Sequence, residues 1–159
     1  MNIEAVAVIE EVTALLAENG LPIADVAASQ PLRFFGIRDG GALIAVVGLE
    51  LHPPFGLLRS LAVRSPFRNR GLAHELVSFA ESHAIGQGVE SLFLLTTTAD
   101  RFFLGLGYSL VCRDEVPSSI RATPQFSGLC PASSAVLCKR VAPRSAGRDA
   151  GPTDSEDRR

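Results

Sequence analysis

The sequence predicts one α/β domain in which a sheet of mixed strand direction packs against helices. Segments with strand and helix periodicity alternate over residues 1–140, and a strong hairpin signal joins two early strands. Of the 159 residues, 47% are hydrophobic and 20% are charged, which is typical of a soluble globular domain. The length fits a single domain that buries a core without disulfide or metal staples.

The first part of the chain predicts a strand, a helix and then three strands. Apolar residues recur at helical spacing from Ile9 to Leu16, and Asn19-Gly20 ends that helix. Asp39-Gly40-Gly41 is a turn signal between two strand-like runs, and the prolines after His52 end the second run. The predicted strands cover residues 4–7, 32–38, 42–51 and 57–63.

The second part predicts a long helix followed by shorter elements. Leu72, Leu76 and Phe79 share one face of a helix over residues 72–84, and Gly86 ends it. The remaining predicted elements are a buried strand over 91–98, a short helix around residues 102–103, and terminal strands over 108–112 and 134–138.

The last 19 residues, 141–159, differ in composition from the rest. They hold four arginines and four acids and almost nothing apolar after Val141. Such a segment cannot bury enough apolar surface to fold, so we expect a disordered tail that follows a domain over residues 1–140.

Charge, hydropathy and cysteine usage exclude several classes of protein. Fifteen basic against 17 acidic residues leave a net charge of −2, which argues against a nucleic-acid partner. No apolar run approaches the ~20 residues of a membrane span, and the N-terminal segment lacks the basic start of a signal peptide. Three cysteines, Cys112, Cys130 and Cys138, lack metal-ligand spacing. We therefore expect a cytoplasmic protein with reduced thiols, no metal and no membrane partner.

A basic loop between the strand over 57–63 and the helix over 72–84 is the strongest candidate binding site. The first amides of a helix have no intrahelical partners, and the helix dipole adds partial positive charge there. Gly71 lacks a Cβ, so a phosphate can approach the backbone closely, with Arg68 and Arg70 beside it. The pattern indicates a pyrophosphate site, although a solvated basic turn would have the same composition. Neither GxGxxG nor GxxxxGK[ST] is present.

Three segments resemble the GNAT N-acetyltransferase superfamily. Residues 68–73 (RNRGLA) are similar to the R/Q-x-x-G-x-G/A loop that binds the pyrophosphate of acetyl-CoA in that family. Residues 58–63 (LRSLAV) resemble its splayed central strand, and residues 102–108 (FFLGLGY) its F-Y-x-x-x-G-F/Y motif. The resemblance implies a mostly antiparallel central sheet flanked by helices, with the splayed strand binding acyl-CoA. The residues it assigns to acetyl-CoA are Leu61, Ala62, Val63, Arg68, Asn69, Arg70, Gly71, Leu72, Ala73 and Phe103.

A narrower resemblance links the chain to the arsenic-resistance N-acetyltransferases. It rests on residues 48–50 (GLE), 57–63 (LLRSLAV), 94–103 (LLTTTADRFF) and 116–136 (VPSSIRATPQFSGLCPASSAV). Related enzymes acetylate the amine of arsinothricin or phosphinothricin, which implies a substrate of that type. One departure concerns the family tyrosine that protonates the departing CoA thiolate, because Phe103 stands at its position and Tyr108 stands where the motif ends.

The acyl-transfer reaction that this resemblance implies needs a base and an oxyanion site. A substrate amine that attacks the thioester directly must lose a proton, and Glu50 is our candidate base at the end of the second hairpin strand. Glu50 as a solvent-facing strand residue is the alternative, and His52 is a second candidate base. Backbone N–H groups near Leu61–Val63 are expected to hold the oxyanion.

Arg59 lies in an otherwise apolar strand and needs a partner, because an unpaired buried charge is costly. It either clamps the carboxylate or arsinate of a substrate in bidentate fashion, or forms a salt bridge to Glu50 or another acid. Adjacent strand residues face opposite sides, so Arg59 and Ser60 are not expected to face a substrate together.

Two further substrate contacts are predicted. Thr97 lies where the sheet is expected to open, and Arg121 lies in the polar segment between the terminal strands. Each has an ordinary alternative, since threonine is common in strands and Arg121 also suits a surface loop without a role.

The leading hypothesis is therefore an acetyl-CoA-dependent N-acetyltransferase that acts on a small amino-acid-like amine. The alternatives are an acetyltransferase for ordinary amino acids, or a non-catalytic CoA-binding or arsenic- or thiol-sensing module, which the Phe103 substitution favours. Many members of the superfamily dimerise, so the resemblance also admits a homodimer.

Overall fold

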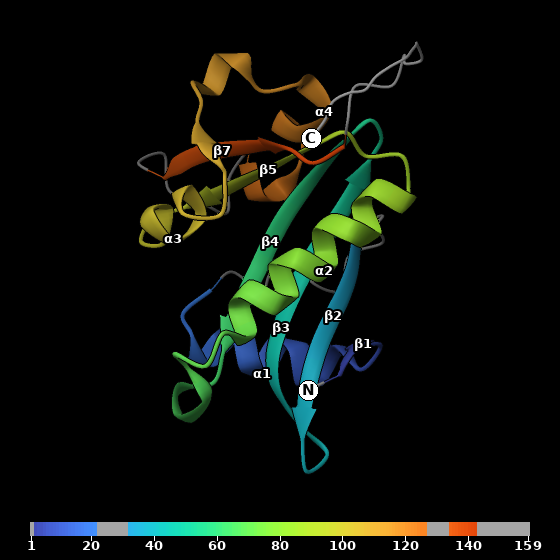
Figure 1. Cartoon of the computed structure of the whole chain (residues 1–159), viewed down its shortest axis with the longest axis vertical. Coiled ribbons are helices and arrows are strands. Elements are labelled where there is room, and N and C mark those ends of the chain that lie inside the picture. The colour runs from blue at the N-terminus through green and yellow to red at the C-terminus, as the bar shows by residue number, and fades with distance from the viewer. Residues whose placement is uncertain (1, 22–31, 127–133, 143–159) are drawn as a thin grey trace, which may run out of the picture.

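The computed structural model describes residues 2–21, 32–126 and 134–142, which form a seven-stranded mixed sheet with helices on both faces (Figure 1). The strand order is β1-β2-β3-β4-β5-β7-β6. The strands are β1 (Ile3–Ala5), β2 (Leu32–Asp39), β3 (Ala42–His52), β4 (Phe55–Val63), β5 (Ser91–Thr96), β6 (Ser109–Leu110) and β7 (Ala135–Arg140). The helices are α1 (Ile9–Glu18), α2 (Leu72–Gly86), α3 (Asp100–Leu104) and α4 (Ser118–Arg121), with 3₁₀ turns η1 (Ser65–Phe67) and η2 (Arg113–Glu115).

The predicted hairpin is confirmed in β2 and β3. Asp39 pairs with Ala42, and the two residues between them, Gly40 and Gly41, have φ of +59° and +88°. Those angles favour glycine, which explains why this turn can be read from the sequence. β3 is central, and its residues from Leu43 to Glu50 are all buried.

Helices cover the two faces of the sheet and define separate cores. The apolar side of α2 packs on β2, β3 and β4, where its Leu76 contacts a cluster that includes Ile44 and Leu58. On the opposite face, Leu16 of α1 joins a second cluster with Phe34 and Val46. A third cluster forms around Ile120 of α4. Of the residues predicted to form the buried face of α2, Leu72 and Leu76 are buried, whereas Phe79 is 36% exposed.

β4 and β5 separate after a short parallel contact, and this confirms the splayed central strand. They pair only where Phe55, Gly56 and Leu57 meet Ser91, Leu92 and Phe93. On its other side β5 pairs with β7 along its whole length. β4 remains paired with β3 as far as Val63. Figure 1 shows the two strands diverging from a common end.

The limits of several elements differ from the predicted ones. β1 spans residues 3–5 rather than 4–7, and β6 holds only Ser109–Leu110 of the predicted 108–112. β5 ends at Thr96 because the Thr96 hydroxyl accepts hydrogen bonds from the amides of Thr98 (3.3 Å) and Ala99 (2.9 Å), which turns the chain into α3. Residues 143–159 of the predicted tail lie outside the described residues.

No helix within the described ranges is both long enough and apolar enough to cross a membrane.

The stability of the fold should fall as the pH drops below about 6.5. Burial, and then the Arg33 charge, hold the pKa of His83 on α2 below its ordinary value of 6.5, and Arg33 Nη1 lies 2.8 Å from its Nε2. Between the two pKa values only the unfolded chain binds the proton, so stability rises with pH there. Urea unfolding from pH 5 to 8 should show this slope, and His83→Gln should make it shallower. An unchanged slope in the variant would contradict the prediction.

Candidate active site

Two adjoining cavities open where β4 and β5 separate. The first, of about 540 Å³, lies between β4 and β5, and we call it the splay cavity. The second, of about 400 Å³, lies between the end of β4 and the start of α2, and we call it the loop cavity. Leu61 and Ala99 line both, so the cavities meet at these residues. A ligand that fills both would pass the unpaired edge of β4.

The loop cavity has the features of an anion site. Gly71 precedes α2 with φ of +80°, and an added Cβ would meet nothing within 4 Å, so the backbone is open at this point. Asn69 also has a positive φ, of +64°. α2 has 15 residues, and the amides of its first turn point out of its N-terminus. The helix dipole adds positive potential there, which suits a phosphate group.

The structure brings most of the residues predicted to bind acetyl-CoA into this region. Those that line the loop cavity are Leu61, Ala62, Val63, Arg68, Asn69, Gly71, Leu72 and Ala73. Phe103 instead lines the splay cavity. Arg70 is not among the lining residues of either cavity, and its guanidinium lies over the Phe67 ring, 5.2 Å from the centroid.

Arg68 is held in place by two contacts. Its Nε donates to the Val63 carbonyl oxygen (3.0 Å), and its Nη2 donates to Asn19 Oδ1 (2.6 Å). Asn19 therefore fixes the guanidinium at the rim of the loop cavity, a role that the sequence did not indicate beyond its position at the end of α1.

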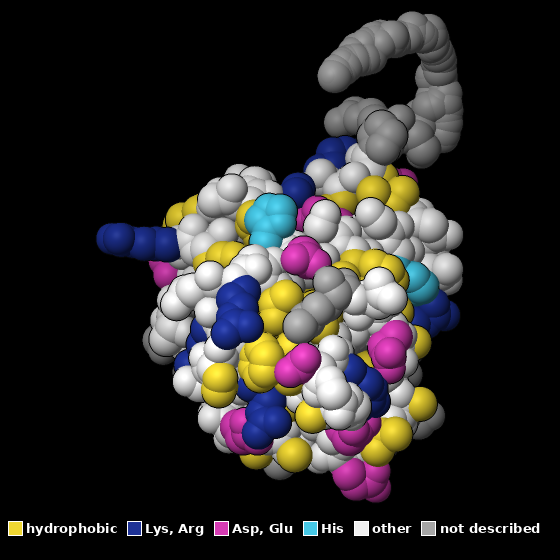
Figure 2. Space-filling model, turned by 60° about the horizontal axis from the view of Figure 1, so that its bottom comes forward, with side chains coloured by type: hydrophobic (Ala, Val, Ile, Leu, Met, Phe, Trp, Pro, Cys, Tyr) yellow, Lys and Arg dark blue, Asp and Glu magenta, His cyan; other side chains and the backbone are white. Residues whose placement is uncertain are grey.

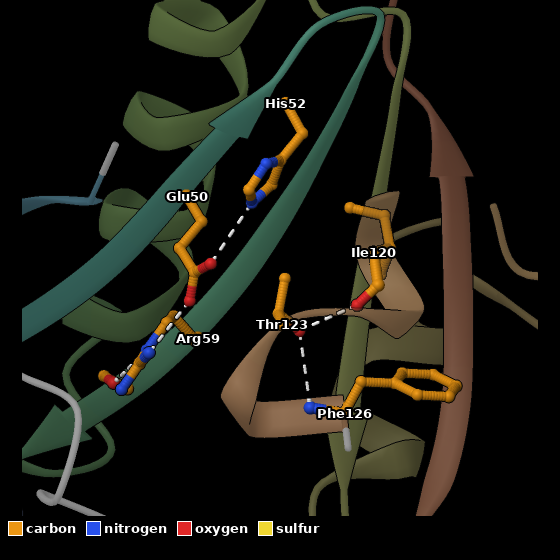
Figure 3. A network of polar contacts seen from close by, with 7 residues as sticks. Glu50, His52, Arg59, Ile120, Thr123 and Phe126 are labelled. Carbon is orange, nitrogen blue, oxygen red and sulfur yellow. Dashed lines mark hydrogen bonds and ion pairs between the residues drawn. The ribbon is translucent and has the colours of Figure 1, made fainter. Parts of the chain in front are cut away.

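Glu50, Arg59 and His52 form a polar network in which Glu50 and Arg59 are buried and His52 is partly exposed (Figure 3). Arg59 Nη1 donates to Glu50 Oε2 (2.9 Å), and the other Glu50 oxygen lies 3.2 Å from His52 Nε2. Glu50 is 0% exposed, so its interpretation as a solvent-facing residue is wrong. The salt bridge between Arg59 and Glu50 is confirmed. Arg59 lines the splay cavity, whereas Glu50 and His52 are not among the residues that line it.

A β-bulge in β4 brings Arg59 and Ser60 together. Val46 pairs with Ala62 and Gly48 pairs with Arg59, so two residues of β4 face one of β3. Ser60 has φ of +58°, and its Oγ accepts a hydrogen bond from Arg59 Nε (3.0 Å). The expectation that these neighbours face opposite sides is therefore wrong, because the strand is not regular there. Both side chains line the splay cavity.

The two predicted substrate contacts have different outcomes. Thr97 lines the splay cavity, but Arg121 is exposed on α4 and lines neither cavity. Two residues that the sequence did not single out, Gln125 and Ser134, line the splay cavity instead. Both follow segments without helix or strand periodicity, so only the fold brings them to the site.

Thr123 stabilises the turn that carries Gln125 (Figure 3). Its buried hydroxyl donates to the Ile120 carbonyl oxygen (2.7 Å) and accepts from the Phe126 amide (3.4 Å). Thr123 does not itself line the cavity, but its hydrogen bonds stabilise the turn that places Gln125 there.

Tyr108 is directed away from the splay cavity. Its hydroxyl donates to Glu81 of α2 (2.9 Å), which also binds Lys139 Nζ of β7 (3.1 Å). Burial first, and then the Glu81 charge, raise the pKa of Tyr108 far above its usual range. Phe103 is buried beside it, with ring centroids 5.5 Å apart. Tyr108 therefore does not replace the missing tyrosine at position 103.

The described ranges contain no group of three or more His, Cys, Asp or Glu side chains that could hold a metal. Cys112 is exposed and Cys138 is half-buried, and burial raises the pKa of the Cys138 thiol. Cys130 lies outside the described residues.

The face that Figure 2 brings forward carries basic and acidic side chains interspersed around apolar ones. No single sign of charge dominates this view.

A family model described as "Acetyltransferase (GNAT) family" matches residues 6–108. A curated relative from Chlorobaculum tepidum, described as an uncharacterised N-acetyltransferase, is 38% identical over 63 residues. That match spans 40% of this chain and 40% of the relative, so it covers well under half of either protein.

Solved structures of acetyltransferases share the fold. N-acetylglutamate synthase from Neisseria gonorrhoeae, complexed with coenzyme A and N-acetyl-glutamate, has a TM-score of 0.73 at 21% identity over 89% of this chain and 35% of that one. Rv2747 from Mycobacterium tuberculosis, in complex with CoA, has a TM-score of 0.70 at 16% identity over 88% of this chain and 99% of that one. At these identities the likeness establishes the fold.

Removing one partner of the buried ion pair should destabilise the protein strongly, and the losses from the two partners should not add. Glu50→Leu or Arg59→Met leaves a buried charge uncompensated, so each should lower the free energy of unfolding by about 3–5 kcal/mol. The double variant should lose less than the sum of the two. Urea unfolding measures this, and the exposed pair Arg64–Glu18 (3.4 Å) is the control, where Arg64→Met should cost less than about 1 kcal/mol. Additive losses at Glu50 and Arg59 would contradict the prediction.

Proposed function

The chain belongs to the acetyltransferase (GNAT) family, and from this premise we propose that it transfers the acetyl group of acetyl-CoA to the amine of a small amino-acid-like substrate. The observation that carries the proposal is the pair of cavities that meet at Leu61 and Ala99. One suits the phosphates and arm of acetyl-CoA, and the other suits an acceptor. Their junction lies beside the freed edge of β4, where a thioester and an amine would meet.

Acetyl-CoA would bind along the loop cavity and β4. The amides at the start of α2 and the Arg68 guanidinium offer donors to the pyrophosphate. Within the described ranges β4 pairs with β5 only as far as Leu57, so the backbone beyond that point can hydrogen-bond the pantetheine amides as an added strand would. Arg70 is a weaker candidate for this role because it stacks on Phe67.

The chemistry needs alignment more than it needs a strong base. Holding the amine against the thioester can supply about 7–11 kcal/mol of the barrier. Backbone N–H groups near Leu61–Val63, which follow the bulge, are the proposed donors to the oxyanion. An α-amine with a pKa of about 8 loses only ~1.4 kcal/mol to become neutral at pH 7. A CoA thiolate with a pKa near ~8.5 leaves without an acid, which makes Phe103 compatible with turnover.

We propose that Glu50 is a positioning residue rather than a direct base. Both of its oxygens are engaged, by Arg59 and His52, and it is not among the residues that line the splay cavity. In this role Glu50 holds the Arg59 guanidinium at the cavity wall. His52, which contacts Glu50, is also not among the residues that line the splay cavity, so we do not propose it as the base. Water in the splay cavity is the proposed proton acceptor.

For the substrate we propose an arsinothricin- or phosphinothricin-type amino acid, and hence a role in arsenic resistance. The support is the family resemblance of residues 48–50, 57–63, 94–103 and 116–136, together with Arg59 at the splay cavity. Arg59 would bind the anionic group of such a substrate, with Thr97 beside it. Arg121 is not proposed for this role, because it lies away from the cavity.

The other hypotheses have less support. Ordinary amino acids would use the same cavities, and only substrate tests separate them. An arsenic- or thiol-sensing module is disfavoured, because burial raises the pKa of the Cys138 thiol and so opposes the thiolate that would bind arsenic. A domain over residues 1–140, a cytoplasmic location and a homodimer stay predictions from the sequence.

Arg68→Ala should weaken acetyl-CoA binding. Loss of one charge-assisted hydrogen bond corresponds to about a tenfold rise in the Kd for CoA, measured by calorimetry. The affinity of the parent protein should also fall as salt is raised. Arg101→Ala is the matched control, since Arg101 is exposed on α3 and lines neither cavity. Equal affinities in the parent and Arg68→Ala would remove Arg68 from the cosubstrate site.

Mass spectrometry of reactions with acetyl-CoA should detect an acetylated amine. The panel contains arsinothricin, phosphinothricin, common amino acids and a polyamine, and we expect product from the first two. Product from ordinary amino acids alone would keep the acetyltransferase and discard the arsenic assignment. CoA binding without any product would favour the non-catalytic module.

A further inference from the structure

Ser134 carries an unpaired hydroxyl at the wall of the splay cavity. The residue is 6% exposed. Among the buried side-chain oxygen and nitrogen atoms of the described residues, its Oγ is the one without a hydrogen-bond partner. A buried hydroxyl without a partner is unfavourable, since it loses water and gains nothing in return. Such a group calls for an explanation.

Two other hydroxyls of this region already have partners. The Thr123 hydroxyl is bonded at both ends of its turn (Figure 3), and the Thr96 hydroxyl accepts from two amides. The main chain of Ser134 is also engaged, because its carbonyl oxygen accepts from Arg113 Nη2 (3.1 Å). The fold therefore holds the backbone of Ser134, while its buried hydroxyl has no partner among the described residues.

The position of Ser134 selects the acceptor over acetyl-CoA as that ligand. Ser134 precedes Ala135, which pairs with Thr96, so it lies on the β7 side of β5. It lines the splay cavity and not the loop cavity. Acetyl-CoA would reach the splay cavity from the loop cavity at Leu61 and Ala99. Ser134 comes from a different segment of the chain.

Among the described residues that line the splay cavity, Arg59 is the charged one, and an acidic oxygen is the group of the acceptor that it attracts. Glu50, which Arg59 Nη1 contacts at 2.9 Å, offsets part of that charge but does not line the cavity. A hydroxyl can donate one hydrogen bond to an anionic oxygen, and such bonds are stronger than those between neutral groups. Resting on the proposed function, we infer that the Ser134 hydroxyl binds an acidic oxygen of the acceptor, either its carboxylate or its phosphinate or arsinate.

Steady-state kinetics of Ser134→Ala with phosphinothricin tests this inference. We expect the KM for phosphinothricin to rise about tenfold, with the KM for acetyl-CoA within twofold of the parent value. Ser134→Thr, which keeps the hydroxyl, should restore the KM to within threefold. Ser119→Ala is the matched control, since Ser119 is exposed on α4.

Thermal unfolding without ligands separates binding from structure. Since the hydroxyl has no partner in the free protein, Ser134→Ala should leave Tm unchanged or raised. A lowered Tm together with equal rises in both KM values would mean that the hydroxyl is structural, and would overturn the inference.

A second acceptor shows which acidic group Ser134 binds. The activity of the parent protein separates a failure of the proposed function from a failure of the Ser134 inference. With 3-aminopropyl(methyl)phosphinate, which lacks the carboxylate, a retained Ser134→Ala effect assigns the phosphinate, and a lost effect assigns the carboxylate. If the parent acetylates no amine, the proposed function fails and this inference fails with it. If the parent is active and Ser134→Ala has an unchanged acceptor KM, only this inference fails.

Discussion

The separation of β4 from β5 after Leu57 is the constraint on which the rest of the structure depends. A strand in the middle of a sheet normally has both edges paired, and here, among the described residues, one edge of β4 has no strand partner from Leu58 to Val63. The released backbone groups would be unfavourable in a closed core. Both cavities open along this edge, so the same break in pairing that weakens the sheet creates the site.

Two sets of side-chain contacts connect the elements on either side of this opening. Glu81 on α2 binds both Tyr108 and Lys139, which ties the β7 side of the molecule to the helix that covers β2–β4. The Glu50–Arg59 pair stabilises β4 from within the sheet, where Gly48 leaves room for the arginine, because an added Cβ would lie 3.2 Å from its Cγ. Stability and site geometry therefore share the same side chains.

Sequence reasoning succeeded where local chemistry decides the structure. The Gly40-Gly41 turn, the amphipathic α2 and the loop before it are all encoded within a few residues, and each appears at or near its predicted position. It did not find the bulge at Ser60, which depends on the pairing of β4 with β3. The sequence analysis also did not identify Gln125 and Ser134 as site residues. They line the cavity only because the fold brings segments that are distant in sequence together there. Arg121, predicted as a substrate contact, lies exposed on helix α4 and lines neither cavity.

The narrow junction between the two cavities has an evolutionary consequence. Among the described residues they share only Leu61 and Ala99. The loop cavity otherwise draws on Asn19 after α1, the end of β4, η1, the loop before α2, and residues of α2 and α3. The wall that carries Gln125 and Ser134 comes from the C-terminal part of the chain. Substitutions there can change which acceptor is accepted without altering the groove that holds the donor, so new specificities can arise by drift in one segment while the other is kept under selection.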